Sequence, residues 1–288
     1  MEEIPLLKGT TEDLKLQSYL NSTLAQLSNT KRKKFRRLYN AFPEQNEVGI
    51  VQTNCYALGC NTTLSGVFEK LSRLNHSCRP NSERWWDPER EVETLYALRN
   101  IEANEEITIS YSGRTARMSR SERQNLTSKA WRFDCNCDCC QLTGFARESS
   151  DEHRELIGMV DDMVGFTPPR RMIILIKKAL ECMDKEGIFG SFMARICYDG
   201  YQLALQTRDL REAKSFIRMS YDQYLLGTGP NSQETRKMLG YVQDPTSHIE
   251  WSVYEPAEEE ENDDNEAEDE DEELLQYIVS SISLLADL

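Results

Sequence analysis

The sequence predicts an α+β protein whose first half is β-rich and whose second half is helical. Between Val48 and Tyr111, short β-type runs alternate with turn residues, as in a domain built from small sheets. From residue 150 to 226 the apolar residues follow the helical period instead. Four of the nine cysteines lie in residues 135–140, between these two regions. The pattern indicates a β-rich domain with a metal-binding segment, followed by an all-α region.

Residues 11–40 precede the β-rich part and have a helical pattern. Their candidate core positions are six apolar residues: Leu14, Leu20, Leu24, Leu27, Phe35 and Leu38. The basic run 31–37 (KRKKFRR) interrupts this apolar pattern. We interpret it as a solvated helix face, with a nuclear-localisation signal or a basic patch as the alternative.

Four runs within the β-rich part are expected to be strands. They are residues 49–58 (GIVQTNCYAL), 82–86 (SERWW), 91–98 (EVETLYAL) and 105–111 (EEITISY). The tripeptide 87–89 has the composition of a hairpin turn between the second and third runs. Ala103 and Asn104 form the expected turn before the fourth run, because asparagine tolerates the left-handed conformation.

The second half of the sequence predicts a bundle of helices. A run at 170–185 follows Pro168 and Pro169, a natural start for a helix. Two more runs, 193–207 and 211–226, flank a short turn at Arg208 and Asp209. They form an expected antiparallel helical hairpin, similar in layout to a tetratricopeptide unit. No second copy recurs at a fixed period, so a repeat array is not predicted.

The acidity of the chain is concentrated near its C-terminal end. The net charge is −15, and residues 255–273 contain 14 acidic residues and no basic ones, which leaves the rest at about −1. So much like charge cannot bury surface, and we expect this stretch to be disordered. Residues 274–288 after it have the pattern of a short amphipathic helix. The nearly neutral remainder does not indicate direct nucleic-acid binding.

Nothing in the sequence indicates a membrane or secreted protein. No apolar run approaches the roughly 20 residues of a membrane-spanning helix. The opening MEEIPLLK lacks the basic start and apolar centre of a signal peptide. The cysteines are clustered, unlike the spacing of a small secreted disulfide framework. We therefore expect an intracellular protein, in the nucleus, the cytoplasm or both.

The spacing of Cys135, Cys137 and Cys140 brings three thiolates within reach of one metal ion. Zinc takes four ligands in a tetrahedron, so a fourth must come from elsewhere in the chain. The segment LSRLNHSCRPN suggests Cys78, which is surrounded by polar residues. Cys139 falls outside the spacing and is the expected spare. The alternatives are buried or free thiols, and a nucleophilic Cys78 paired with His76, which zinc binding by Cys78 would exclude.

Three segments together resemble the SET-domain protein methyltransferases. Residues 75–81 (NHSCRPN) resemble the NHSCxPN signature of that family, and 105–111 (EEITISY) resemble the strand that carries its catalytic tyrosine. Residues 133–140 (FDCNCDCC) resemble its post-SET zinc segment. The resemblance is close over about 45–145 and looser over 150–250. The SET-and-MYND-like and fungal SET proteins also have a tetratricopeptide-like region after the zinc segment.

The resemblance implies a function and a set of site residues. It implies transfer of a methyl group from S-adenosylmethionine to a lysine of a histone or another protein, without direct nucleic-acid or membrane binding. Tyr111 would be the catalytic hydroxyl, with an ordinary strand tyrosine as the alternative. The implied cofactor-binding residues are Asn75 and His76 against the cofactor, Ser72 in the same wall, and Phe133 stacked on the adenine. Phe133 is otherwise a core aromatic. The implied zinc ligands are Cys78, Cys135, Cys137 and Cys140, in a structural site.

The sequence departs from the family pattern at its start. The Gly-x-Gly segment of the family has no match before Val48, and the chain's one such triplet lies at 227–229 in the helical region. The MYND insert is also missing. We therefore expect a SET domain that lacks its first strands over 1–145, a helical domain over 150–254 and an acidic tail over 255–288. The alternative function is a catalytically inactive SET-like, zinc-binding interaction module.

Overall fold

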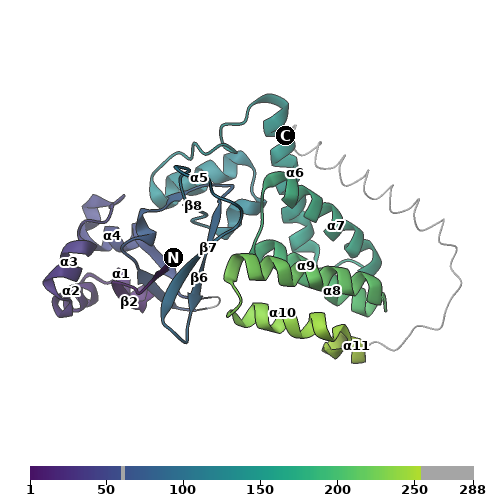
Figure 1. The fold of residues 1–288 in the computed structure, drawn as a ribbon. Helices are drawn as coiled ribbons and strands as arrows, with labels where there is room; N and C mark the ends of the chain where they lie inside the picture. Colours follow the sequence, from purple (N-terminus) through teal and green to yellow (C-terminus); the bar gives the residue numbers. More distant parts are fainter. Residues whose placement is uncertain (60–61, 254–288) are drawn as a thin grey trace, which may run out of the picture. The chain divides into compact units, whose positions relative to one another are not determined.

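The computed structural model describes residues 1–59 and 62–253, which form two compact units (Figure 1). The first unit contains residues 1–112, 121–140 and 226–232. The second contains residues 113–120, 141–225 and the described residues from 233 onward. The acidic stretch and the expected amphipathic helix after it lie outside the described residues. Among the described helices, none has the length and apolarity needed to cross a membrane.

Three small sheets form the frame of the first unit, as the sequence predicts. The first is antiparallel, with the order β1 (Glu2–Glu3), β7 (Val92–Ala97), β6 (Ser82–Asp87). The second is also antiparallel, with the order β2 (Leu7–Thr10), β4 (Leu64–Val67), β3 (Cys55–Ala57). The third pairs two short parallel strands, β5 (Asn75–His76) and β8 (Thr108–Ile109).

The β6–β7 hairpin turns where the sequence predicts. The Asp87 carboxylate accepts the backbone N–H groups of Glu89 and Arg90, both at 3.0 Å. Glu91 completes the turn with a φ of 52°. Asn104 adopts a φ of 70° in the other predicted turn. The Asp87 side chain thus stabilises the first turn through bonds to the nearby backbone, and the second uses the tolerance of asparagine for the left-handed conformation.

Helices cover one side of the β2–β4–β3 sheet in the first unit. They are α1 (Thr11–Lys15), α2 (Gln17–Gln26), α3 (Asn29–Phe35) and α4 (Asn46–Asn54). Of the six predicted core residues in 11–40, five are buried and Leu27 is half-buried against them. The basic run lies on α3 and just beyond it. Its Arg32 donates to the carbonyls of Leu24 and Leu27, so it caps the end of α2.

The expectation of a strand over residues 49–58 is wrong for most of that run. Residues 46–54 form α4, and only Cys55–Ala57 become strand β3. Ile50, Val51 and Asn54 lie on one face of α4 and are buried, Ile50 and Val51 in the helical core. Valine and isoleucine favour strands in isolation, but packing against other helices overrides this weak preference. The run 105–111 is also shorter as a strand, because only Thr108–Ile109 pair with β5.

The second unit is helical, in agreement with the sequence. Its α-helices are α6 (Gly144–Met163), α7 (Pro169–Glu186), α8 (Ser191–Gln206), α9 (Leu210–Thr228), α10 (Gln233–Gln243) and α11 (Ile249–Val253). Short 3-10 turns η3 (Gly113–Arg117) and η4 (Pro245–Ser247) complete it. The predicted turn between α8 and α9 has Arg208 at a φ of 59°, and the Asp209 carboxylate caps α9 by accepting the Glu212 N–H. Helix α9 begins in this unit, and its last residues belong to the first.

The Gly-x-Gly triplet at 227–229 has a packing role in the first unit. Gly229 has a φ of 78°, and a Cβ at this position would lie 2.2 Å from the Tyr96 hydroxyl of β7. Only glycine fits a left-handed conformation in such close contact. Gly229, the last residue of the triplet, therefore packs directly on Tyr96 within the first unit, and the conformational freedom of glycine is used there for packing.

Candidate functional site

Four cysteines predicted as zinc ligands meet in the first unit. The sulfur atoms of Cys78, Cys135, Cys137 and Cys140 all lie within 4.8 Å of one another. Cys78 Sγ is 3.9 Å from Cys135 Sγ and 3.6 Å from Cys140 Sγ. Zn–S bonds of about 2.3 Å in a tetrahedron place two sulfurs about 3.8 Å apart. The cluster therefore has the size of a Cys₄ zinc site, and it can hold one ion.

The local backbone explains how these sulfurs converge. Cys78 follows β5, whereas the other three cysteines follow helix α5 (Arg120–Trp131). The Cys140 N–H donates to the Cys137 carbonyl at 2.8 Å, which folds the Cys-x-Cys-x-x-Cys run into a tight turn. The Cys78 N–H in turn faces Cys137 Sγ at 3.4 Å, a typical partner for a thiolate. Cys139 is buried but is not part of the four-sulfur group.

His76 connects this cluster to the strand that ends at Tyr111. Its Nδ1 accepts the backbone N–H of Tyr111 at 3.1 Å, which fixes the proton on Nε2. Nε2 lies 3.4 Å from Cys78 Sγ and donates to it. Burial lowers the pKa of His76 to about 4, so the ring is neutral near pH 7. Both ring nitrogens are engaged, which favours a positioning role for this histidine over that of a free base.

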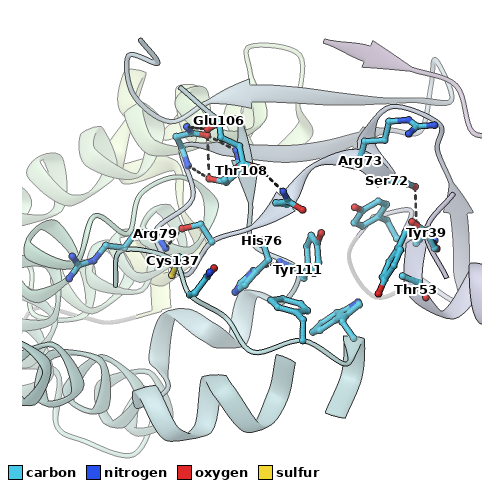
Figure 2. Close-up of a pocket in the computed structure, with 18 of the residues that line it drawn as sticks. Tyr39, Thr53, Ser72, Arg73, His76, Arg79, Glu106, Thr108, Tyr111 and Cys137 are labelled. Atoms are coloured by element: carbon cyan, nitrogen blue, oxygen red, sulfur yellow. Dashed lines mark hydrogen bonds between the residues drawn. The ribbon is translucent and has the colours of Figure 1, made fainter. Parts of the chain in front are cut away.

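A cavity of about 860 Å³ lies beside the cluster, within the first unit. Its volume is within the usual range for a small-molecule or cofactor site. The cavity is lined by all five residues predicted to act in catalysis or cofactor binding: Ser72, Asn75, His76, Tyr111 and Phe133. Figure 2 shows His76 and Tyr111 beside each other, with Ser72 toward one side and Cys137 toward the other. The fold thus gathers residues that are up to 61 positions apart in the sequence.

Tyr111 is held by both its hydroxyl and its ring. The hydroxyl donates to the Leu74 carbonyl at 2.7 Å. The ring packs against His76, Trp131 and Phe133, with centroid distances of 5.3, 5.4 and 6.1 Å. Burial, and then the nearby Glu106 carboxylate, raise the pKa of Tyr111. The hydroxyl is therefore neutral and has its proton committed to Leu74, which leaves its oxygen lone pairs to accept a hydrogen bond.

Asn81, directly before β6, binds the residues that lead into β8, next to the cavity. Its Nδ2 donates to the Glu106 carbonyl at 2.8 Å and to the Glu105 carboxylate at 2.9 Å. Its Oδ1 accepts the N–H of Thr108 at 2.9 Å. The Asn75 amide donates to the Glu106 carboxylate at 2.5 Å. These bonds span the two-residue pairing of β5 with β8 and stabilise a strand pair too short to be stable alone.

The sequence prediction missed several residues that line the cavity. They come from α3–α4, β3 and the end of α5: Tyr39, Thr53, Tyr56 and Trp131. Tyr56 donates to the Leu71 carbonyl at 3.3 Å, and the Arg84 guanidinium lies 4.6 Å from its ring centre. Trp131 stands two residues before Phe133, and this aromatic pair next to the cysteine run is the signal that could have revealed it.

Comparison with known proteins identifies the domain that contains this cavity. The family model described as "SET domain" matches residues 4–112. Residues 4–112 are therefore a SET domain. The matched part of the SET domain includes Asn75, His76, Cys78 and Tyr111, and the other three cysteines of the cluster follow it in the chain.

Curated relatives extend the similarity along the chain, beyond the SET domain. Histone-lysine N-methyltransferase set5 of Schizosaccharomyces pombe is 28% identical over 250 residues, which cover 85% of this chain and 76% of the relative. Protein-lysine N-trimethyltransferase SMYD5 of Gallus gallus is 34% identical over 44% of this chain and 30% of its own length. Histone-lysine N-methyltransferase Smyd1 of Mus musculus is 24% identical over 62% of this chain and 42% of its own length. The chain therefore spans less than half of these two vertebrate relatives.

Proposed function

We propose that this protein is an S-adenosylmethionine-dependent protein-lysine N-methyltransferase. One observation carries the proposal: Ser72, Asn75, His76, Tyr111 and Phe133 line a single cavity beside the four-cysteine cluster. The names of the relatives support the same reaction class, since all three are lysine methyltransferases.

A polar wall and an aromatic wall of the cavity would bind different parts of the cofactor. Asn75 and His76 form the polar wall, where the Asn75 side-chain oxygen would accept from the cofactor's ammonium while its amide donates to Glu106. Ser72 lies in the same wall. Phe133 would provide an aromatic face for the adenine. When bound, S-adenosylmethionine supplies an electrophilic methyl group on a sulfonium.

Tyr111 would orient the attacking lysine amine. Methyl transfer is an in-line displacement, so it depends mainly on the alignment of the reacting atoms. The amine must be neutral, although the pKa of free lysine is about 10.4. Aromatic walls such as Trp131 and Phe133 disfavour the ammonium by desolvation, and a sulfonium charge nearby lowers the amine pKa further. The neutral Tyr111 oxygen, with its proton on Leu74, would then accept a hydrogen bond from the amine.

The cysteine cluster would serve as a structural post-SET zinc site. Zinc at Cys78, Cys135, Cys137 and Cys140 would tie the end of β5 to the segment that begins at Phe133. Both chain segments line the cavity, so metal binding and cavity shape are expected to be linked. None of the four ligands is left for nucleophilic catalysis. The reaction itself needs no metal.

The proposed substrate is a lysine side chain of a histone or another protein. A histone substrate is favoured by two of the relatives, whose names specify histone lysine. A nuclear or cytoplasmic location follows from such a substrate. The alternative function, a zinc-binding interaction module without catalysis, predicts that no methyl group is transferred, whether or not the cavity binds S-adenosylmethionine.

A paired assay separates these two functions. Purified protein is titrated calorimetrically with S-adenosylmethionine, and radiolabelled methyl transfer is measured on core histones and on an unrelated lysine-rich protein. The proposal expects saturable binding, lost in Asn75→Ala, together with label on lysine. Binding without transfer to any protein, or no binding by a zinc-loaded and folded sample, would support the interaction module instead.

A further inference from the structure

The Glu3 carboxylate binds a turn of the backbone that lies 66 to 68 residues further along the chain. Its Oε1 accepts the N–H groups of Glu69 and Lys70, each at 2.9 Å. Its Oε2 accepts the N–H of Lys70 at 3.1 Å and that of Leu71 at 3.0 Å. Hydrogen bonds to a charged acceptor are stronger than neutral ones, and here one carboxylate gathers three consecutive donors.

Strand β1 explains why Glu3, and not its neighbour, reaches this turn. β1 pairs with β7, with Glu2 opposite Thr94 and Glu3 opposite Glu93. Successive side chains of a strand point to opposite faces. The Glu2 carboxylate therefore turns to the exposed Arg90, at 2.5 and 2.7 Å, whereas the Glu3 carboxylate turns to the backbone of 69–71. Glu2 is therefore a suitable control for Glu3, because it is the same residue type in the same strand but contacts Arg90 and not residues 69–71.

The turn held by Glu3 leads directly into the polar wall of the cavity. Leu71 is fully buried, and its carbonyl accepts from Tyr56, which lines the cavity. Leu74 accepts the Tyr111 hydroxyl. Ser72 lies between Leu71 and Leu74 in the chain, and Asn75 and His76 follow Leu74. All three line the cavity. The segment 69–76 thus carries both the anchor of Tyr111 and the residues that face the cavity, and Glu3 fixes its first three amides.

We infer that Glu3 is a positioning residue, which acts through residues 69–71 to set the geometry of the cofactor wall. The inference rests on the proposed function, because that function makes this wall the binding surface for S-adenosylmethionine. Glu3 touches no reacting group, and it does not itself line the cavity. Its carboxylate instead holds the start of a backbone segment whose carbonyls at Leu71 and Leu74 accept hydrogen bonds from two tyrosines of the cavity.

The test compares Glu3→Gln with Glu2→Gln in the full chain. Glutamine has the length of glutamate but offers one acceptor oxygen and turns an amide donor toward backbone donors. Hydrogen–deuterium exchange of the peptide covering 69–76 is measured without ligand, and S-adenosylmethionine binding is measured by calorimetry. Zinc content and the thermal transition are measured on the same samples, and Glu3→Asp is added as the conservative variant.

Glu3→Gln is expected to raise the exchange rate at 69–71 and to weaken S-adenosylmethionine binding by about tenfold, the usual effect of one lost charged hydrogen bond. Zinc content should not change, Glu2→Gln should behave as wild type, and Glu3→Asp should recover part of the affinity. Wild-type affinity in Glu3→Gln overturns the inference, as does equal weakening in Glu2→Gln. If wild type itself binds no S-adenosylmethionine, the proposed function fails, and the exchange rates alone then decide whether Glu3 holds the turn.

Discussion

The Nη2 atom of Arg123 lies 3.3 Å from Cys139 Sγ and 4.0 Å from Cys140 Sγ, and the whole Arg123 side chain is buried. Arg123 comes from helix α5, one residue before Gln124, which donates to the Cys135 carbonyl at 2.5 Å. A zinc ion with four thiolates has a net charge of −2. A buried guanidinium beside it therefore offsets negative charge that would otherwise be costly to bury.

Replacing Arg123 by methionine should weaken zinc binding about 10- to 100-fold, the usual range for groups just outside the ligands. Methionine keeps most of the apolar stem and removes the charge. Competition with a coloured zinc chelator measures the affinity, and Lys129→Met, on the exposed side of the same helix, is the control. Unchanged zinc affinity in Arg123→Met would show that the guanidinium only fills space.

The ligand assignment predicts different results for two neighbouring cysteines. Purified protein should contain about one zinc per chain. Cys137→Ser should lose the metal and destabilise the domain, because structural zinc contributes directly to folding. Cys139→Ser should keep the zinc, since Cys139 is not part of the four-sulfur group. Elemental analysis checks both variants, and equal zinc loss in both would mean that the ligands are assigned wrongly.

Tyr111→Phe should reduce methyl transfer about 100- to 1,000-fold, in the range seen when one well-placed catalytic hydrogen bond is removed. Cofactor affinity and zinc content should change little, because the ring and its aromatic contacts remain. Tyr19→Phe is a matched control, since Tyr19 packs on the helical core away from the cavity. The measurement is single-turnover transfer of labelled methyl. Full activity in Tyr111→Phe would remove Tyr111 from the catalytic role.

We expect Asp199 of α8 to make the stability of the second unit depend on pH. Burial raises its pKa to about 6, and Arg195 at 3.2 Å only partly opposes the effect. A raised pKa means that folding favours the protonated acid. Its contribution to stability is therefore present below the unfolded value of about 3.9 and is lost as the pH rises through about 6.

Asp199→Asn should accordingly stabilise the protein by about 2–3 kcal/mol at pH 8, at 1.36 kcal/mol per pKa unit. The gain should fall to about half at pH 5. Urea unfolding at the two pH values measures this gain, and Asp222→Asn, at an exposed position of α9, is the control variant. A constant effect of Asp199→Asn at both pH values would contradict the raised pKa.

Much of the site was predictable because its residues occur in short, chemically specific runs. The spacing of Cys135, Cys137 and Cys140 limits how far apart three thiolates can lie, whatever the fold around them. Asn75, His76 and Cys78 are likewise adjacent in one run, and the hairpin at Asp87 follows from local turn chemistry. Local sequence determines such features because the interactions that form them span only a few residues.

The tertiary structure alone decided features that depend on distant partners. Residues 46–54 are helical because their apolar face packs on α1 and α2, although their valine and isoleucine content favours a strand. Tyr56 and Trp131 reach the cavity through chain paths that no local pattern encodes. Glu3 and Gly229 act on residues more than 60 positions away, at Glu69 and Tyr96. The sequence by itself determined the chemistry of the cysteine run and the polar wall, and long-range packing decided how these parts are held together.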